Sequence, residues 1–238
     1  MTEYKAPLRE IDFVLNELLD AGEHYQNLVG AEEATPDMVS AIVEEAARFV
    51  ENEIAPLNRV GDQQGCHWQD GTVTTPDGFV QAYQRYVEGG WPALAHDPQW
   101  GGQGLPESFG IVVNELLGTA NWAWSMYPGL CHGAMNTLET HGTAEQKELY
   151  LKPLVEGRWM STMCLTESHC GTDLGLLRTK AEPQKDGSFR ISGTKIFISA
   201  GEHDLTENII HIVLARLPDA PEGTEGISLF IVPKYLPE

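Results

Sequence analysis

The feature of this sequence that most constrains its fold is a change in hydrophobic periodicity near residue 158. Before that point, apolar residues recur three or four positions apart, as in Val39, Ile42, Val43 and Ala46, which is typical of amphipathic helices. After it, short runs rich in β-branched residues, such as 209–216, replace the helical spacing. We therefore expect an α+β fold in which an all-helical part is followed by a β part.

Local signals place the boundaries of these elements. The sequence Thr-Pro-Asp occurs at 35–37 and again at 75–77, and it joins a capping side chain to a first-turn proline and an acidic residue. Each copy is expected to start a helix, and Pro56 is expected to end the first of them. Thr143 and Gln146 form a capping box for a later helix. The expected helices cover 11–20, 36–53, 76–88, 107–119, part of 122–140 and 144–156, with a loop over 61–74. The expected strands cover 160–165, 177–181, 189–192, 195–199, 209–216 and 227–233, with hairpin turns at 185–187 and 192–193.

Composition excludes several classes of function. The formal net charge of −20 argues against nucleic acid or an anionic membrane surface as a partner, because both are polyanions. No apolar run approaches the roughly 18 residues of a membrane span, and the N-terminus has no secretory pattern. The four cysteines lack disulfide or zinc spacing, so we expect reduced thiols, a cytoplasmic location and no metal.

Two sequence segments carry a resemblance to a known family. Residues 165–173 read LTESHCGTD, and residues 192–199 read SGTKIFIS. Together they resemble the LTEP-x-AGSD loop and the NG-x-K hairpin of the FAD-dependent acyl-CoA dehydrogenases. The resemblance implies an N-terminal helical domain over 1–158 and an antiparallel, β-barrel-like middle domain over 159–238, the latter incomplete.

The resemblance also implies which residues contact the flavin. Backbone groups of Cys164 and Leu165 and the Thr166 hydroxyl would pair with its pyrimidine edge. In the loop that follows, Ser168 and Cys170 are departures from the family pattern. Phe197 stands where many members have Trp, and Ser199 stands where the family has Thr. The full set of expected cofactor-binding residues is Met163, Cys164, Leu165, Thr166, Gly171, Thr172, Phe197, Ile198 and Ser199. Thr172 is also expected to contact the substrate thioester, and Gly171 to allow close approach of the backbone.

The expected reaction is oxidation of an acyl-CoA thioester to the trans-2-enoyl-CoA, by α-proton abstraction and β-hydride transfer to flavin N5. The family's catalytic base is a glutamate of a C-terminal helical domain, which we expect to lie beyond residue 238, so no catalytic residue is assigned here. We accordingly expect the chain alone to bind FAD weakly and to be inactive. The implied partners are an electron-transfer flavoprotein and, in the full-length protein, further copies of the chain.

Several alternatives remain open at this point. The resembled subgroup suggests 3-(methylthio)propanoyl-CoA as substrate, and a medium- or long-chain fatty acyl-CoA is the second candidate, with residues 127–135 placed to influence the choice. A non-catalytic binding protein that keeps the flavin-type fold is another reading. A third is a thiol acyltransferase or thioesterase that uses Cys131 or Cys164, although buried structural thiols are commoner. His169 is interpreted as a surface histidine rather than a general acid.

Overall fold

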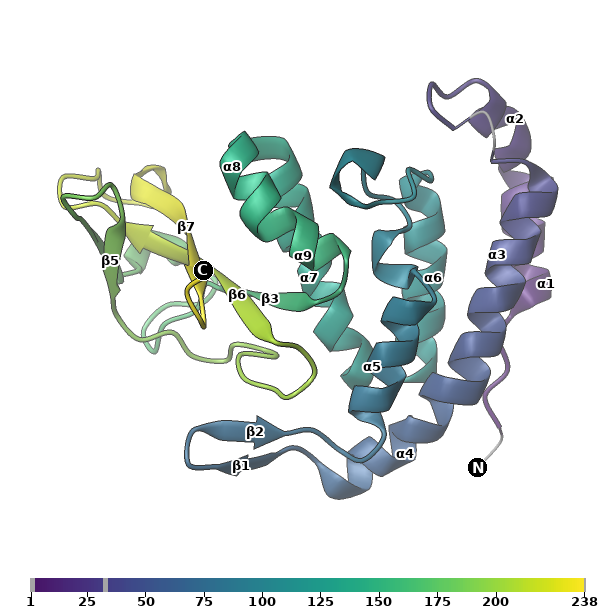
Figure 1. Cartoon of the computed structure of the whole chain (residues 1–238), viewed down its shortest axis with the longest axis horizontal. Coiled ribbons are helices and arrows are strands. Elements are labelled where there is room, and N and C mark those ends of the chain that lie inside the picture. Colours follow the sequence, from purple (N-terminus) through teal and green to yellow (C-terminus); the bar gives the residue numbers. More distant parts are fainter. Residues whose placement is uncertain (1–2, 32–33, 238) are drawn as a thin grey trace.

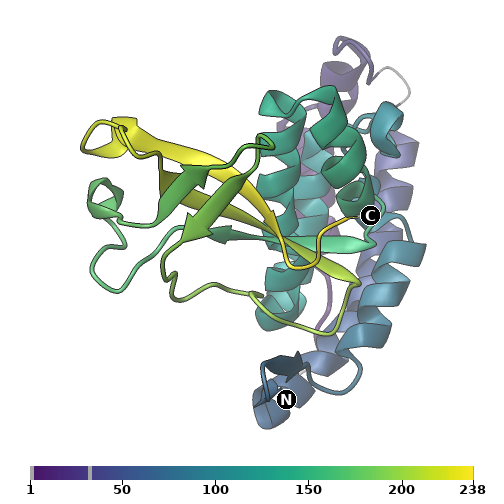
Figure 2. The same ribbon diagram turned by 60° about the vertical axis from the view of Figure 1, so that its left-hand side comes forward.

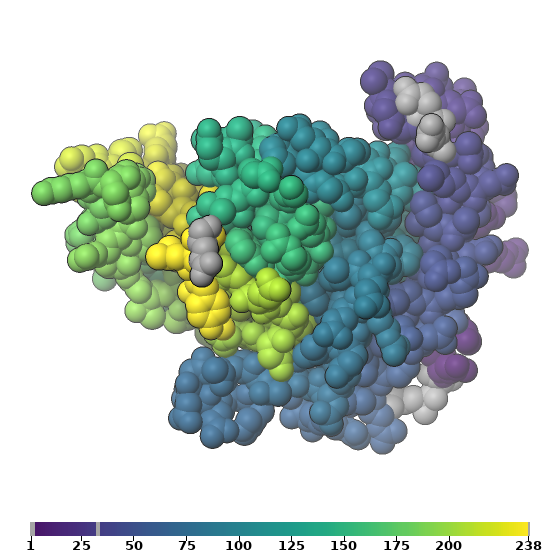
Figure 3. Space-filling model, in the orientation of Figure 1, coloured from purple at the N-terminus to yellow at the C-terminus, as the bar shows by residue number. Residues whose placement is uncertain are grey.

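A computed structural model describes residues 3–31 and 34–237, so residues 1, 2, 32, 33 and 238 of the two expected domains lie outside the described part. The helices gather on one side of the molecule and a twisted sheet on the other (Figure 1). Turning the view by 60° shows the sheet projecting from the helices (Figure 2). In the space-filling view the yellow segments, which are late in the chain, lie directly against the teal helices (Figure 3).

The helical part follows much of the expected pattern, but a helix at Ala21–Gln26 was not expected and two further features differ. Its α-helices are α1 Leu8–Asp12, α2 Ala21–Gln26, α3 Pro36–Phe49, α4 Ala55–Gln64, α5 Phe79–Glu88, α6 Glu107–Ala120, α7 Trp122–His141, α8 Ala144–Gln146 and α9 Lys152–Val155. Three π-helical segments, Phe13–Leu18, Val50–Ile54 and Lys147–Leu151, continue α1, α3 and α8. The Thr35 side chain accepts the Met38 amide and the capping box of Thr143 is present, as expected.

The first difference is that Pro56 does not end the helix. The π-helical segment Val50–Ile54 precedes it, and Pro56 then occupies the first turn of α4, where a missing amide hydrogen is tolerated. The second difference concerns Thr75, whose hydroxyl donates to Asp204 at 2.7 Å rather than capping a helix. The following helix, α5, therefore starts later, at Phe79.

The expectation of a purely antiparallel sheet is wrong. The strands are β3 Trp159–Cys164, β4 Lys180–Pro183, β5 Phe189–Ser192, β6 Asn208–Arg216 and β7 Ile227–Pro233. β6 pairs with β7 in antiparallel fashion but with β3 in parallel, and it meets β4 in parallel at one residue pair. The more than forty residues between β3 and β6 are long enough for the crossover that a parallel pair requires. The expected loop at 61–74 contains the end of α4 and a hairpin, β1 His67–Gln69 and β2 Thr72–Thr74.

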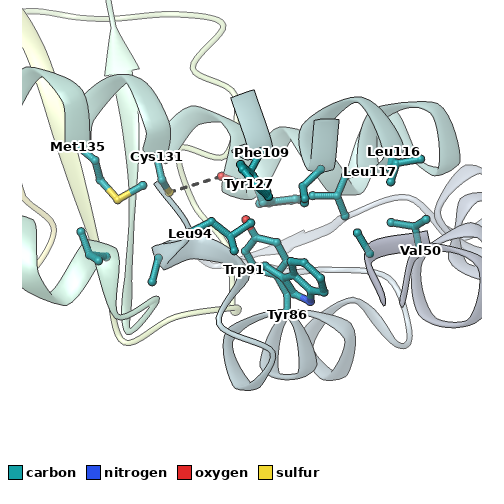
Figure 4. Close-up of a cluster of buried hydrophobic side chains, with 14 of the residues drawn as sticks. Val50, Tyr86, Trp91, Leu94, Phe109, Leu116, Leu117, Tyr127, Cys131 and Met135 are labelled. Carbon is teal, nitrogen blue, oxygen red and sulfur yellow. Dashed lines mark hydrogen bonds between the residues drawn. The ribbon is translucent and has the colours of Figure 1, made fainter. Parts of the chain in front are cut away.

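The main core lies among the helices and extends to the sheet through β3. Val50, Leu116 and Leu117 are completely or almost completely buried (Figure 4). α7 packs against β3, and the Ser161 amide of the strand donates to Cys131 Sγ of the helix at 3.2 Å. This contact anchors β3 on α7, and the predicted site begins where the strand ends, at Cys164.

Candidate functional site

The first group of predicted residues lies at the end of β3 and in the loop that follows. Met163 is half-buried and packs against the helical core, while Cys164 is buried. Leu165 and Thr166 are half-buried directly beyond the strand. The backbone then turns sharply, because Glu167 and Cys170 exchange amide hydrogen bonds of 2.9 and 3.1 Å.

The second group lies in the segment 195–199, which meets the first group directly. The Ile196 amide donates to Thr166 O at 2.9 Å, and Lys195 Nζ donates to Leu165 O at 2.9 Å. The structure therefore brings together the two sequence segments that carried the family resemblance. It does so through Lys195 and Ile196, which the sequence reasoning did not single out.

Glu167 holds this junction together. Its side chain is 5% exposed, and Oε1 accepts from Lys195 Nζ at 2.9 Å, from the Thr179 amide at 2.9 Å and from the Thr179 hydroxyl at 2.6 Å. Oε2 accepts the Arg178 amide at 2.8 Å. Burial by itself raises the pKa of Glu167, but the hydrogen bonds from Thr179, Lys195 and the Arg178 amide outweigh it and lower the pKa to about 2. Glu167 is therefore ionised at neutral pH.

Gly193 is required for Lys195 to reach Glu167. A Cβ atom added to Gly193 would lie 2.3 Å from Thr179 Oγ1 and 2.9 Å from Thr179 Cα, so no larger residue fits without a backbone shift. From the sequence, Gly193 was predicted only to be part of a hairpin turn. No such hairpin forms at 192–193, since β5 ends at Ser192 and the chain continues past Thr179 toward Glu167.

The expected strand at 195–199 is also wrong, because a strained turn occupies this segment. Phe197 has a φ of +57° and Ala200 a φ of +54°, values that no strand residue adopts. The turn is closed by a hydrogen bond of 3.1 Å from the Gly201 amide to Ile198 O. Left-handed conformations of non-glycine residues cost about 1–3 kcal/mol each and cluster at functional sites. The Phe197 side chain is 89% exposed, so the turn presents an aromatic ring to the outside.

The remaining predicted residues are mostly exposed to solvent. Gly171, Thr172 and Ser199 are exposed, and Ile198 is half-buried. A Cβ atom on Gly171 would lie at an ordinary 3.6 Å from Thr166 Cγ2, so packing within the chain does not require glycine there. Any requirement for glycine at 171 would have to come from a bound molecule.

One group in the described part of the chain has ligand atoms close enough to hold a metal ion. These atoms belong to Glu167, His169 and Cys170, and they lie within 4.8 Å of one another. The Lys195 ammonium group, however, already occupies a cation's position at Glu167 Oε1. His169 Nε2 lies 3.0 Å from Leu176 O, which is consistent with its interpretation as a surface side chain. The chemistry of this group favours an internal ion pair over a metal ligand set.

A second anchoring contact, also missed from the sequence, follows the strained turn. Asp204 Oδ1 accepts both the amide and the hydroxyl of Thr75. His203 is 3% exposed, and its ring lies edge-on to Tyr127 with centroids 5.5 Å apart. Burial lowers the pKa of His203 to about 4, so this histidine is neutral at neutral pH. These contacts join the segment after the turn to β2 and α7.

The thiols proposed as nucleophiles are in unsuitable surroundings. Burial raises the pKa of Cys131 to about 11, and burial also raises the pKa of Cys164. A thiol nucleophile needs a lowered pKa and access to solvent. His132 follows Cys131 in the sequence, but its Nε2 lies 3.0 Å from Glu107 Oε1. The geometry therefore disfavours a thioesterase or acyltransferase.

Comparisons with known proteins agree with the geometry. Residues 36–158 match the family model for the acyl-CoA dehydrogenase N-terminal domain, and residues 162–238 match that for the acyl-CoA dehydrogenase middle domain. A 3-methylmercaptopropionyl-CoA dehydrogenase of Ruegeria pomeroyi is 45% identical over 98% of this chain and 40% of its own length. The chain thus spans about two fifths of that relative.

Solved structures share the fold. The butyryl-CoA dehydrogenase of Megasphaera elsdenii superposes with a TM-score of 0.70 and 26% identity, over 83% of this chain and 49% of the other. An acyl-CoA dehydrogenase of Bacillus anthracis, solved in complex with FAD, has a TM-score of 0.66 and 23% identity over 83% of this chain and 31% of its own. Throughout residues 3–31 and 34–237, no helix combines the length and apolar character needed to cross a membrane.

Proposed function

This chain belongs to the acyl-CoA dehydrogenase family, and we propose that it supplies the flavin-contacting parts of an FAD-dependent enzyme that oxidises an acyl-CoA thioester to a trans-2-enoyl-CoA. The observation that carries the proposal is the junction between 165–166 and 195–196, which lies next to an exposed aromatic ring on a strained turn. A phenylalanine that is 89% exposed at positive φ buries little of its ring within the chain, and it fits a flat partner that packs on it.

The residues present fit an isoalloxazine ring. Thr166 offers a hydroxyl at the end of β3, Phe197 offers an apolar face, and Ser199 offers a second hydroxyl two residues later. FAD, when bound, would supply the acceptor for the substrate hydride. The chain's own contribution would be to satisfy the polar edge of the ring with backbone groups and hydroxyls and to keep water from its apolar face. Thr172, which is exposed beside this junction, is the proposed contact to the thioester's CoA portion.

We propose 3-(methylthio)propanoyl-CoA as the substrate, since this is the compound in the name of the Ruegeria relative. A medium- or long-chain fatty acyl-CoA is the second candidate, and butyryl-CoA, the compound in the name of the Megasphaera structure, is a third. A cavity of about 30 Å³ is lined by Cys131, His132 and Met135 of α7 together with Asn114 of α6. The three α7 residues belong to the segment 127–135, which is proposed to influence chain-length preference. An electron-transfer flavoprotein as acceptor, assembly with further copies and a cytoplasmic location complete the proposal.

The test uses the natural protein that contains this chain. Anaerobic addition of 3-(methylthio)propanoyl-CoA is expected to bleach the flavin's visible absorbance and to yield the enoyl-CoA by mass spectrometry, more efficiently than butyryl-CoA. Phe197→Ala is expected to weaken FAD binding, whereas Phe13→Ala, at a phenylalanine 48% exposed in the helical part, is not. A purified protein that neither binds FAD nor oxidises any acyl-CoA would point instead to the non-catalytic binding protein.

A further inference from the structure

The ion pair between Glu167 and Lys195 lies between the two segments proposed to contact the flavin. The side chains are 5% and 10% exposed, and Lys195 Nζ is 2.9 Å from both Glu167 Oε1 and Leu165 O. Neither residue belongs to the proposed contact set. Both are placed where they determine how that set is arranged.

Two hydrogen bonds of this region cross directly from one segment to the other. One runs from the Lys195 ammonium group to Leu165 O, and the other runs from the Ile196 amide to Thr166 O. Since these bonds involve adjacent residues on both sides, they fix the direction of the chain as it enters the strained turn at Phe197. Glu167 in turn orients the ammonium group and ties it to Thr179.

A role in overall stability alone explains this arrangement poorly. A buried ion pair is often no more stabilising than apolar side chains of the same size, because both charges lose their hydration. Its best-attested use is to specify one geometry among several. The geometry specified here is the register between residues 165–166 and residues 195–196.

We propose that Glu167 and Lys195 act jointly as positioning residues, which set the segment 163–166 against the segment 197–199 and thereby the affinity of the site for flavin. This inference rests on the proposed function. The two residues touch each other and the backbone, and they act on the cofactor only through the segments that they align.

The first measurement uses amide hydrogen exchange in the 238-residue chain without cofactor. In Lys195→Met and in Glu167→Gln, the Ile196 amide is expected to exchange at least tenfold faster than in the unaltered chain. The Lys234 amide, which donates to Ile209 O at 2.8 Å in the sheet, is expected to be unchanged. The matched control is Lys152→Met, which removes the exposed partner of Glu148 with the same change of charge.

The second measurement is FAD titration of the natural protein that contains this chain. Each single substitution is expected to raise the dissociation constant at least tenfold, and Lys195→Arg is expected to restore most of the affinity. Because the two residues act as one unit, the double variant is expected to bind no more weakly than the worse single variant. Losses that multiply in the double variant would contradict joint action.

The outcomes separate the positioning role from the proposed function. An unchanged Ile196 exchange rate in folded Lys195→Met overturns the positioning role, whatever the flavin result. A natural protein that binds no flavin refutes the proposed function, and the exchange rates still decide whether the pair aligns the segments. If Lys195→Met does not fold, Glu167→Gln, which keeps the size of the side chain, carries both measurements.

Discussion

Replacing Glu167 with Gln is expected to remove a defined part of the acid sensitivity of this chain. The folded-state pKa of Glu167 is about 2, against an ordinary value of 4.5. A carboxyl group whose pKa is depressed by folding stabilises the fold above its unfolded pKa, and this contribution is lost as the pH falls toward the folded value. At 1.36 kcal/mol per pKa unit, the contribution at neutral pH is about 3 kcal/mol.

The assay is urea unfolding of the unaltered chain and of Glu167→Gln at pH 7 and at about pH 3.5. From the same two pKa values, linkage predicts that Glu167 loses roughly 1 kcal/mol of its contribution between these conditions. Glutamine does not ionise, so the free energy of unfolding of the variant should fall by that much less over the same interval. Other carboxylates titrate in both proteins and cancel in the difference. Equal pH dependence in the two proteins would refute the account of Glu167 as a carboxylate held ionised by Thr179 and Lys195.

Three further predictions concern single positions. Gly193→Ala is expected to destabilise the chain by about 1–3 kcal/mol in urea unfolding, because the added carbon overlaps Thr179; an unchanged midpoint would contradict the close approach. Ala200→Gly is expected to raise the free energy of unfolding by about 0.5–1 kcal/mol, since glycine adopts a φ of +54° without steric cost. A lower free energy of unfolding would show that the turn is not strained. Iodoacetamide at pH 8 is expected to alkylate the exposed Cys66 and to leave Cys131 unmodified, because burial raises the pKa of Cys131 to about 11; mass spectrometry reads out both sites. Rapid labelling of Cys131 in the folded chain would show that its thiol is neither buried nor protonated.

Elements whose signals are local were predicted well from the sequence. The cap at Thr35 and the capping box at Thr143 depend on residues within one turn, and both are present. The β6 strand was predicted because its segment is rich in β-branched residues. The change from helices to strands near residue 158 is likewise confirmed.

Features that depend on distant partners were missed. The parallel pairing of β3 with β6 joins residues 49 positions apart in the chain, such as Trp159 and Asn208, and no local pattern encodes it. The segment 195–199 was predicted to be a strand because its residues favour strands, yet tertiary contacts through Lys195 and Ile196 override that preference.

The residues of the candidate site likewise include some that a local motif identified and one whose role depends on a distant partner. Thr166 and Phe197 were identified from the family motif, and they lie on segments that meet, although their flavin contacts stay predictions. Glu167 lay inside that motif but had no assigned role. Its partner is 28 residues away, so only the three-dimensional structure reveals why a carboxylate is needed there.

The hydrogen bonds between Asp204 and Thr75, and the packing of His203 on Tyr127, have a mechanical consequence. They attach the turn at 197–200 to the helical part at one end, while the Ile196 amide attaches its other end to Thr166 in the loop after β3. The segment that carries Phe197 is therefore held at both ends, and a substitution that removes either attachment is expected to change where the ring lies.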